Sequence, residues 1–121
     1  MKEDTRRKLL EVTLELVSKK GYIGTTTKEI AQRAGVSEIT LFRHFGSKES
    51  LFIEMLNTFS FLPRLKEIIP KLESISYKQA LEEIGIRFFF TLKERKSMIK
   101  IILSEIKLYP EKLRWIYNNF I

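Results

Sequence analysis

Hydrophobic and polar positions along this chain recur at the spacing of an α-helix, and no stretch keeps the alternation of a β-strand. A first stripe predicts a helix over residues 4–20 and consists of five positions: Leu9, Val12, Thr13, Leu16 and Val17. Gly21 ends this helix, because glycine adopts the left-handed conformation of a helix C-terminus at little cost. The pattern therefore predicts an all-α fold.

Two short helices joined by a glycine turn are predicted next. Thr26 and Glu29 match a capping box and begin a helix over residues 27–34. Gly35 closes it, and Ser37 is an N-cap for a helix over residues 38–45. The inward positions are small or apolar: Ile30, Ala31, Ala34, Val36, Leu41 and Phe45. This is the layout of a helix-turn-helix.

The rest of the chain predicts further helices. Gly46-Ser47 breaks the pattern, and a fourth helix starts at Lys48 with an apolar face of Leu51, Phe52, Met55, Leu56 and Phe59. Pro63 and Pro70 delimit a short segment, followed by helices over residues 77–92 and 96–108 and a last helix from Pro110. We expect a three-helix domain over residues 1–47, joined through the fourth helix to a helical domain over residues 48–121.

Composition narrows the classes of protein. There are 22 Lys+Arg against 15 Asp+Glu in 121 residues, a net charge of +7, which suits a polyanionic partner as well as a solvated lysine face. The absence of cysteine excludes disulfides, thiolate metal sites and cysteine nucleophiles. Neither a signal peptide nor an apolar run of membrane-spanning length is present, so we expect a soluble cytoplasmic protein without membrane contact.

The outward face of the helix over residues 38–45 carries chemistry that can read DNA bases. Its candidates are Glu38, Ile39, Thr40, Arg43 and His44. Arg43 can donate two hydrogen bonds to a guanine edge, and Glu38 can accept one from cytosine N4. The methyl groups of Ile39 and Thr40 can contact a thymine methyl.

Phosphate contacts are expected beside these base readers. The hydroxyls of Thr26 and Thr27, with the free amides that begin their helix, suit a phosphate. Lys48 places a charge just outside the motif. Arg6, Arg7 and Lys28 can add screened attraction, or can simply be solvated.

Taken together, these residues resemble the TetR/AcrR family of bacterial and archaeal regulators over residues 5–56. The similarity rests on six elements in register: Gly21-Tyr22, Thr25-Thr26-Thr27, Ile30-Ala31, Ala34-Gly35-Val36-Ser37, Leu41-Phe42-Arg43-His44-Phe45 and Ser47-Lys48-Glu49-Ser50-Leu51. The resemblance implies DNA contacts, mostly to phosphates, by Thr26, Ser37, Thr40, His44 and Lys48, with Arg43 on a base or the backbone. Phe42 stands where the family commonly has a phosphate-binding tyrosine, so that hydrogen bond is missing here.

The resemblance also implies a ligand-responsive repressor that binds a palindromic operator in double-stranded DNA as a homodimer. Its second domain would bind a small apolar or cationic effector, with the fourth helix as the lever between the two functions. Phe88, Phe89 and Ile102 are the candidate pocket residues, although aromatic residues at this spacing also build ordinary cores. No cofactor or metal is expected. An unfinished apolar face around Trp115 favours a truncated chain, and a divergent short family member is the alternative.

Other functional classes of protein fit the sequence less well. An enzyme is disfavoured, because the chain has one histidine, His44, and lacks a glycine-rich phosphate loop, a histidine pair and a nucleophile elbow. A helical protein-interaction module without sequence-specific DNA binding is the main alternative. RNA binding is disfavoured because the major groove of A-form RNA is too narrow for this helix.

Overall fold

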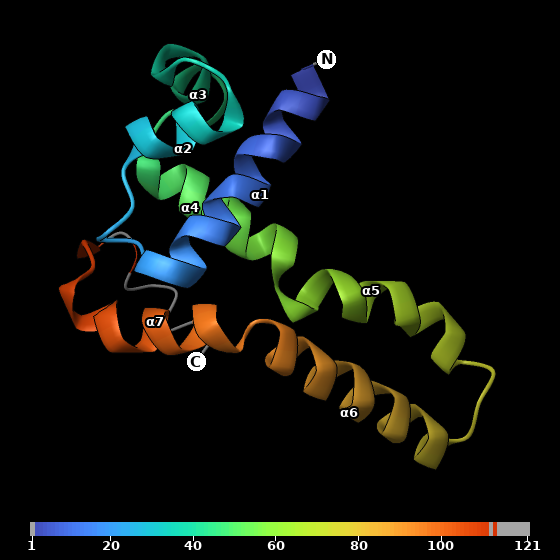
Figure 1. Ribbon diagram of the computed structural model, residues 1–121. Helices are drawn as coiled ribbons and strands as arrows, with labels where there is room; N and C mark the ends of the chain where they lie inside the picture. The colour runs from blue at the N-terminus through green and yellow to red at the C-terminus, as the bar shows by residue number, and fades with distance from the viewer. Residues whose placement is uncertain (1, 112, 114–121) are drawn as a thin grey trace.

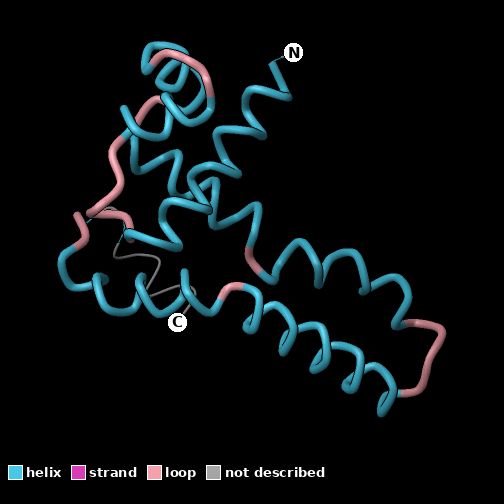
Figure 2. Tube along the Cα trace, viewed as in Figure 1, coloured by secondary structure: helices cyan, strands magenta, loops and turns pink. Residues whose placement is uncertain are grey.

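The structure, a computed structural model, describes residues 2–111 and residue 113, and every regular element within them is helical. The helices are α1 (Lys2–Lys20), α2 (Thr27–Ala34), α3 (Glu38–Phe45), α4 (Lys48–Phe59), α5 (Phe61–Leu72), α6 (Tyr77–Glu94), α7 (Lys96–Glu105) and a 3₁₀ turn (Ile106–Leu108). In Figure 1, α5 and α6 form an antiparallel hairpin that projects from the group α1–α4, and α7 returns beneath α1. Figure 2 shows that only short loops connect the helices.

A single hydrophobic core joins the two ends of the described chain. Helix α1 packs against α2, α4 and α7, so its apolar stripe is covered on several sides. Leu9 and Leu16 of α1 are almost fully buried, and so are Met55 of α4 and Leu113. Because Met98 and Ile102 of α7 belong to the same cluster, the core is continuous across the boundary predicted at residues 47/48. That boundary stays a prediction.

Local signals place most helix ends where the sequence predicts them. The bounds of α2 and α3 match the prediction, and the side chains of Ser37 and Ser47 cap α3 and α4 through the backbone N–H groups of Thr40 and Ser50. Gly21, Gly35 and Gly46 all have positive φ angles, between 75° and 82°. These ends depend on residues within one helical turn, which is why local sequence predicts them.

The capping box at α2 is only half formed. The Thr26 hydroxyl oxygen accepts a hydrogen bond from the Glu29 backbone N–H, as predicted. The Glu29 carboxylate does not return to the Thr26 backbone. It pairs instead with the Lys20 ammonium at 2.6 Å, because the end of α1 lies beside the start of α2.

The segment delimited by Pro63 and Pro70 is helical throughout, which corrects the prediction of a short punctuated stretch. Pro63 lies in the first turn of α5, where a backbone N–H has no helical partner to lose. Pro70 lies in the last turn, where the one hydrogen bond that it removes is near solvent. Most of the predicted last helix, including Trp115, lies outside the described residues. Within the described part, no helix combines the length and apolarity that crossing a membrane requires.

Candidate nucleic-acid interface

Helix α3 is held by one face and presents the other to solvent. Leu41 and Phe45 are buried against the neighbouring helices, and the Ser37 cap sets where the helix begins. Of the five predicted base-reading residues, Ile39 is 70% exposed and Arg43 is exposed, while Glu38, Thr40 and His44 are half-buried. Helical spacing puts Ile39, Thr40 and Arg43 on the side away from the buried residues, whereas Glu38 lies near the buried side and accepts a hydrogen bond from Thr27.

The hydroxyl groups near the starts of α2 and α3 differ in what they can still donate. The Thr26 oxygen accepts from the Glu29 N–H, which leaves its hydroxyl hydrogen available for a phosphate. Thr27 donates its hydroxyl hydrogen to the Glu38 carboxylate at 2.9 Å, so a phosphate can receive it only after that bond breaks. Thr26 is thus the better placed of the two.

Ser37 and Thr40 form a similar local pair. The Ser37 oxygen accepts from the Thr40 backbone N–H at 3.1 Å, and the two hydroxyl groups lie 3.1 Å apart. One hydroxyl donates to the other, and the second keeps its hydrogen for an incoming acceptor. The pair can therefore donate one hydrogen bond to a phosphate at the start of α3.

Phe42 departs from the inward face of α3. Its ring is 40% exposed, and the neighbouring ring of His44 leans toward Phe45 with the two centroids 6.2 Å apart. The ring therefore lies at the outer surface of α3 rather than in the core. The ring can contact the sugar-phosphate backbone without donating a hydrogen bond.

The predicted phosphate-binding cations differ in whether they already form ion pairs within the protein. Arg6 forms an ion pair with Glu54, and its guanidinium lies 4.7 Å from the centre of the Phe45 ring. Arg7 pairs with Glu11 along α1. Lys28 and Arg43 are exposed and enter no ion pair within the described residues. Arg6 is therefore part of the scaffold, and Lys28 and Arg43 are available to a ligand.

Lys48 begins α4 in an unusual environment. Its ammonium lies 4.2 Å from the centre of the Tyr22 ring, a cation–π contact. Burial lowers the pKa of Lys48 from its ordinary value, against the opposing effect of the Glu49 and Glu105 carboxylates. The sequence pointed to Lys48 and, through the Gly21-Tyr22 pair, to Tyr22, but it gave no signal that the two residues meet or that the Glu105 carboxylate acts on Lys48.

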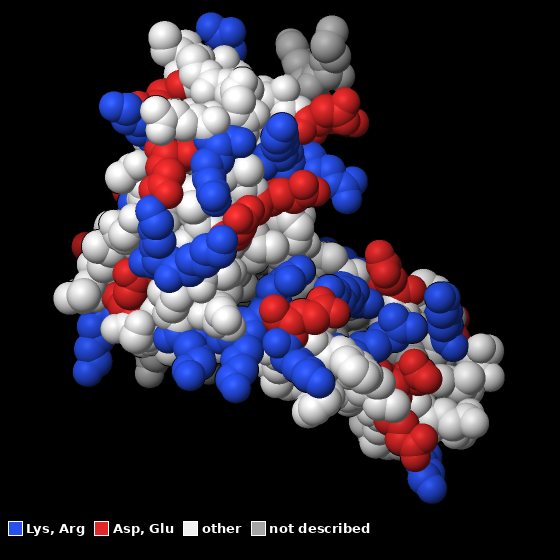
Figure 3. Space-filling model, viewed as in Figure 1, with Lys and Arg blue, Asp and Glu red and all other residues white. Residues whose placement is uncertain are grey.

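Positive charge is distributed over the molecule rather than confined to α3. In Figure 3, Lys and Arg side chains alternate with Asp and Glu over α1–α4, and others project along the lower edge near α7. The net charge of +7 thus supports general attraction to a polyanion without marking the interface by itself.

The three candidate effector-pocket residues do not line a common cavity. Ile102 is buried in the main core, Phe88 packs edge-on against Phe61 at 5.1 Å between centroids, and Phe89 is 61% exposed. None of them lines either of the two cavities found between α5 and α6. The hydrophobic pattern correctly predicted an apolar surface on this part of the chain. It could not show which neighbouring helix each side chain faces.

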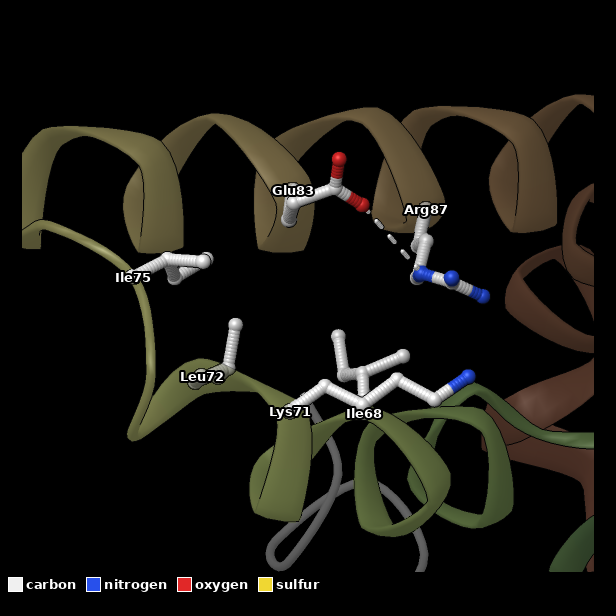
Figure 4. A pocket seen from close by; sticks show the side chains of 6 residues that line it. All are labelled: Ile68, Lys71, Leu72, Ile75, Glu83 and Arg87. Atoms are coloured by element: carbon white, nitrogen blue, oxygen red, sulfur yellow. Dashed lines mark ion pairs between the residues drawn. The ribbon is translucent and has the colours of Figure 1, made fainter.

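The two cavities share one arginine. One, of about 270 Å³, is lined by Ile68, Lys71, Leu72, Ile75, Glu83 and Arg87 (Figure 4). The other, of about 320 Å³, is lined by Arg64, Glu67, Arg87 and Phe90. Arg87 Nε lies 3.7 Å from a Glu83 carboxylate oxygen and makes no hydrogen bond within the described residues. Among those residues no three His, Asp or Glu side chains gather as a metal site requires.

Comparison with known proteins connects this geometry to a family. Residues 9–55, which run from α1 into α4, match the family model of bacterial regulatory proteins of the tetR family. YvkB of Bacillus subtilis, a helix-turn-helix regulator of uncharacterised function, is 32% identical over 97% of this chain and 66% of its own length. The repressor KstR2 of Rhodococcus jostii is 27% identical over 96% of the chain and 57% of its own length.

Two further similarities agree with these. IcaR of Staphylococcus aureus, a negative regulator of a biofilm operon, is 29% identical over 80% of the chain and 52% of its own length. A crystal structure from Mesorhizobium loti, assigned to the TetR-type regulators, superposes with a TM-score of 0.71 at 28% identity. The superposition covers 98% of this chain and 61% of the chain in that crystal structure. The chain therefore spans between about half and two thirds of the length of these relatives.

Proposed function

Because this chain belongs to the TetR family of transcriptional regulators, we propose that it represses transcription by binding an operator with α3 in the major groove. The observation that carries the proposal is the two-sided character of α3. Leu41 and Phe45 anchor the helix, while Ile39 and Arg43 stand exposed on the opposite face. Arg43 is the first candidate for a base contact, since it is exposed and forms no ion pair within the described residues.

Phosphate contacts would fix the orientation of the helix on the duplex. Thr26 and the Ser37–Thr40 pair have hydroxyl hydrogens left to donate, and Lys28 and Lys48 supply positive charge. The proposed operator is a palindrome bound by a homodimer. The half-sites of this operator lie one DNA turn apart, ~34–36 Å. The repressors KstR2 and IcaR, among the relatives, support the direction of regulation.

We further propose that a small effector controls the affinity for DNA. The cavities beside Arg87 lie between α5 and α6, and α4 leads directly into this hairpin from the DNA-binding helices. An effector changes the affinity only if it binds the two conformations of the protein unequally. Helix α4 is the connecting element, because it packs on α1 and α3 as well as on α5.

Selection from random-sequence duplexes tests the DNA-binding proposal. The wild-type chain should enrich a palindromic sequence, and its mass in solution should show whether a dimer binds. Arg43→Ala should relax the preference at one base pair of each half-site by roughly 1–3 kcal/mol. Lys28→Ala is the matched control, because it removes an exposed charge from α2 and should weaken all sequences about equally.

A helical protein-interaction module is the alternative function, and the same experiment separates the two. It predicts no DNA binding even at ~50 mM salt, where phosphate contacts are strong, and no effect of Arg43→Ala. Unselective, salt-sensitive binding by a monomer would instead remove the operator-reading part of the proposal for this chain. Enrichment of one sequence would support the operator-binding regulator, and the absence of any DNA binding would support the interaction module.

A further inference from the structure

A carboxylate from α7 holds the backbone where α1 ends. Oε1 of Glu105 accepts a hydrogen bond from the Tyr22 backbone N–H at 2.9 Å and another from the Tyr109 hydroxyl at 3.1 Å. The same carboxylate lies against Gly21, where any Cβ would overlap it. Gly21 has a φ of 79°, which other residues rarely adopt, so the backbone conformation favours glycine here, and a larger residue would also displace the Glu105 carboxylate. The end of α1 is thus tied to α7 by a contact that spans 83 residues of sequence.

Two other aromatic rings, those of Phe52 and Tyr109, hold the Tyr22 ring in place. Its centroid lies 4.9 Å from that of Phe52 and 5.3 Å from that of Tyr109, and the latter two are 5.8 Å apart. All three residues are buried, with at most 6% of their surface exposed. The position of the Tyr22 ring therefore follows from α4 and from the chain just after α7.

Lys48 also contacts the Tyr22 ring. Its ammonium lies over the Tyr22 ring at the first residue of α4, where the positive end of the helix dipole opposes a cation. A lysine at such a position would otherwise sample many rotamers and lose that freedom on binding a phosphate. The ring offsets the dipole and restricts the ammonium to one region before DNA arrives.

We propose that Tyr22 is a positioning residue for Lys48, holding its ammonium for a DNA phosphate, and that Glu105 of α7 sets the place of the Tyr22 ring. This inference rests on the proposed DNA-binding function. It gives α7 a direct connection to a phosphate-binding group, since a displacement of α7 relative to α1 moves Glu105, the loop after Gly21 and the ring together. The connection bypasses α3 and the base-reading residues.

The dependence of DNA affinity on salt is the first test. On a random-sequence duplex, Lys48→Ala should lower the slope of log K against log salt by about one. Tyr22→Leu, which removes the ring, should reproduce most of that decrease, and Tyr22→Phe, which keeps the ring, should restore the wild-type slope. In the double variant Tyr22→Leu/Lys48→Ala, the slope should equal that of Lys48→Ala alone, because both changes remove the same contact.

A control elsewhere in the core separates positioning from folding. Leu9→Ala removes a fully buried side chain of α1, roughly three helical turns before Gly21, so it should lower the melting temperature while leaving the salt slope near wild type. Nuclear magnetic resonance provides a readout that needs no DNA and tolerates destabilised variants. The Lys48 ε-methylene protons should be shifted upfield by the Tyr22 ring, and Glu105→Ala should reduce that shift, whereas Glu105→Gln, which keeps an acceptor, should preserve more of it.

Each outcome has one meaning. If Lys48→Ala lowers the slope and Tyr22→Leu does not, the positioning role is wrong while DNA binding through Lys48 stands. If the effects of Tyr22→Leu and Lys48→Ala add in the double variant, Tyr22 acts on the core rather than through Lys48, which also overturns the proposal. If the wild-type chain binds no duplex, the proposed function and this inference fail together, whatever the Lys48 resonances show.

Discussion

The hydroxyl of Thr27 donates a hydrogen bond to a carboxylate oxygen of Glu38 at 2.9 Å, and this bond joins the first residue of α2 to the first residue of α3. The contact fixes how the two helices of the motif meet. It also keeps an acidic group at the N-terminal end of the proposed recognition helix, where the helix dipole favours it. The same carboxylate repels any phosphate that approaches this end.

Removing that charge should strengthen general DNA binding. Glu38→Ala and Glu38→Gln should each raise the affinity for random-sequence duplex by roughly threefold to fivefold, about what one close charge contributes in high dielectric. Glu38→Gln keeps an acceptor for Thr27, so it should preserve stability better than Glu38→Ala. Fluorescence anisotropy and thermal unfolding of both variants check this, and an unchanged affinity in both would place Glu38 away from the phosphates.

Restoring a hydroxyl at position 42 should tighten DNA binding. The Phe42 ring is 40% exposed, so Phe42→Tyr can place its hydroxyl outside the core and donate to a phosphate. We expect a gain of roughly 1 kcal/mol, about fivefold in affinity, with unchanged sequence preference. Titration of one selected duplex measures it. Weaker binding would mean that the ring turns inward when DNA is bound.

Helix α7 should contribute to the stability of the DNA-binding helices. Ile102 is buried in the core that it shares with α1 and α4, so Ile102→Ala should reduce the free energy of unfolding by about 2–5 kcal/mol. Leu103→Ala is the matched control: this side chain is 47% exposed, and its loss should change stability by roughly 0.5 kcal/mol or less. Amide exchange in α3 should accelerate with Ile102→Ala. Destabilisation confined to α4–α7 would support the domain boundary predicted at residues 47/48.

Alkaline pH should destabilise the fold through Tyr22. Burial, together with the nearby Glu49 carboxylate, raises its pKa from about 10 to about 12. The folded protein therefore holds this proton more tightly than the unfolded chain. The associated stability, roughly 1–3 kcal/mol, is fully present below pH 10 and is lost as the pH rises towards 12.

Tyr22→Phe isolates this effect, because it keeps the ring and removes the titrating group. The variant should lose less stability than the wild type between pH 10 and 12, as followed by urea unfolding. The phenolate absorbance near 295 nm should show one late-titrating tyrosine fewer. Burial and the Glu105 carboxylate also raise the pKa of Tyr109, so part of the late absorbance should remain. Parallel loss of stability in both proteins would assign the alkaline effect elsewhere.

Local sequence was enough to predict the bounds of the two motif helices and which of their side chains are buried. The bounds of α2 and α3 follow from Thr26, Ser37 and Gly35, each of which acts within one turn of its own position. Periodicity then separates Leu41 from Arg43, because helical geometry alone sends them to different faces. Both features were predictable since they require no knowledge of distant contacts.

The contacts of charged groups and rings between helices depend on how the helices pack and were not predictable from local sequence. The pairing of Glu29 with Lys20, the bond from Thr27 to Glu38 and the ring beneath Lys48 each join different elements. The contact between Tyr22 and Glu105 depends on the packing of α1 against α7, and the separation of Phe88 from Ile102 depends on which face of each helix is covered. The local pattern shows whether a side chain is apolar or charged. Which partner it contacts depends on how all the helices pack to bury the core.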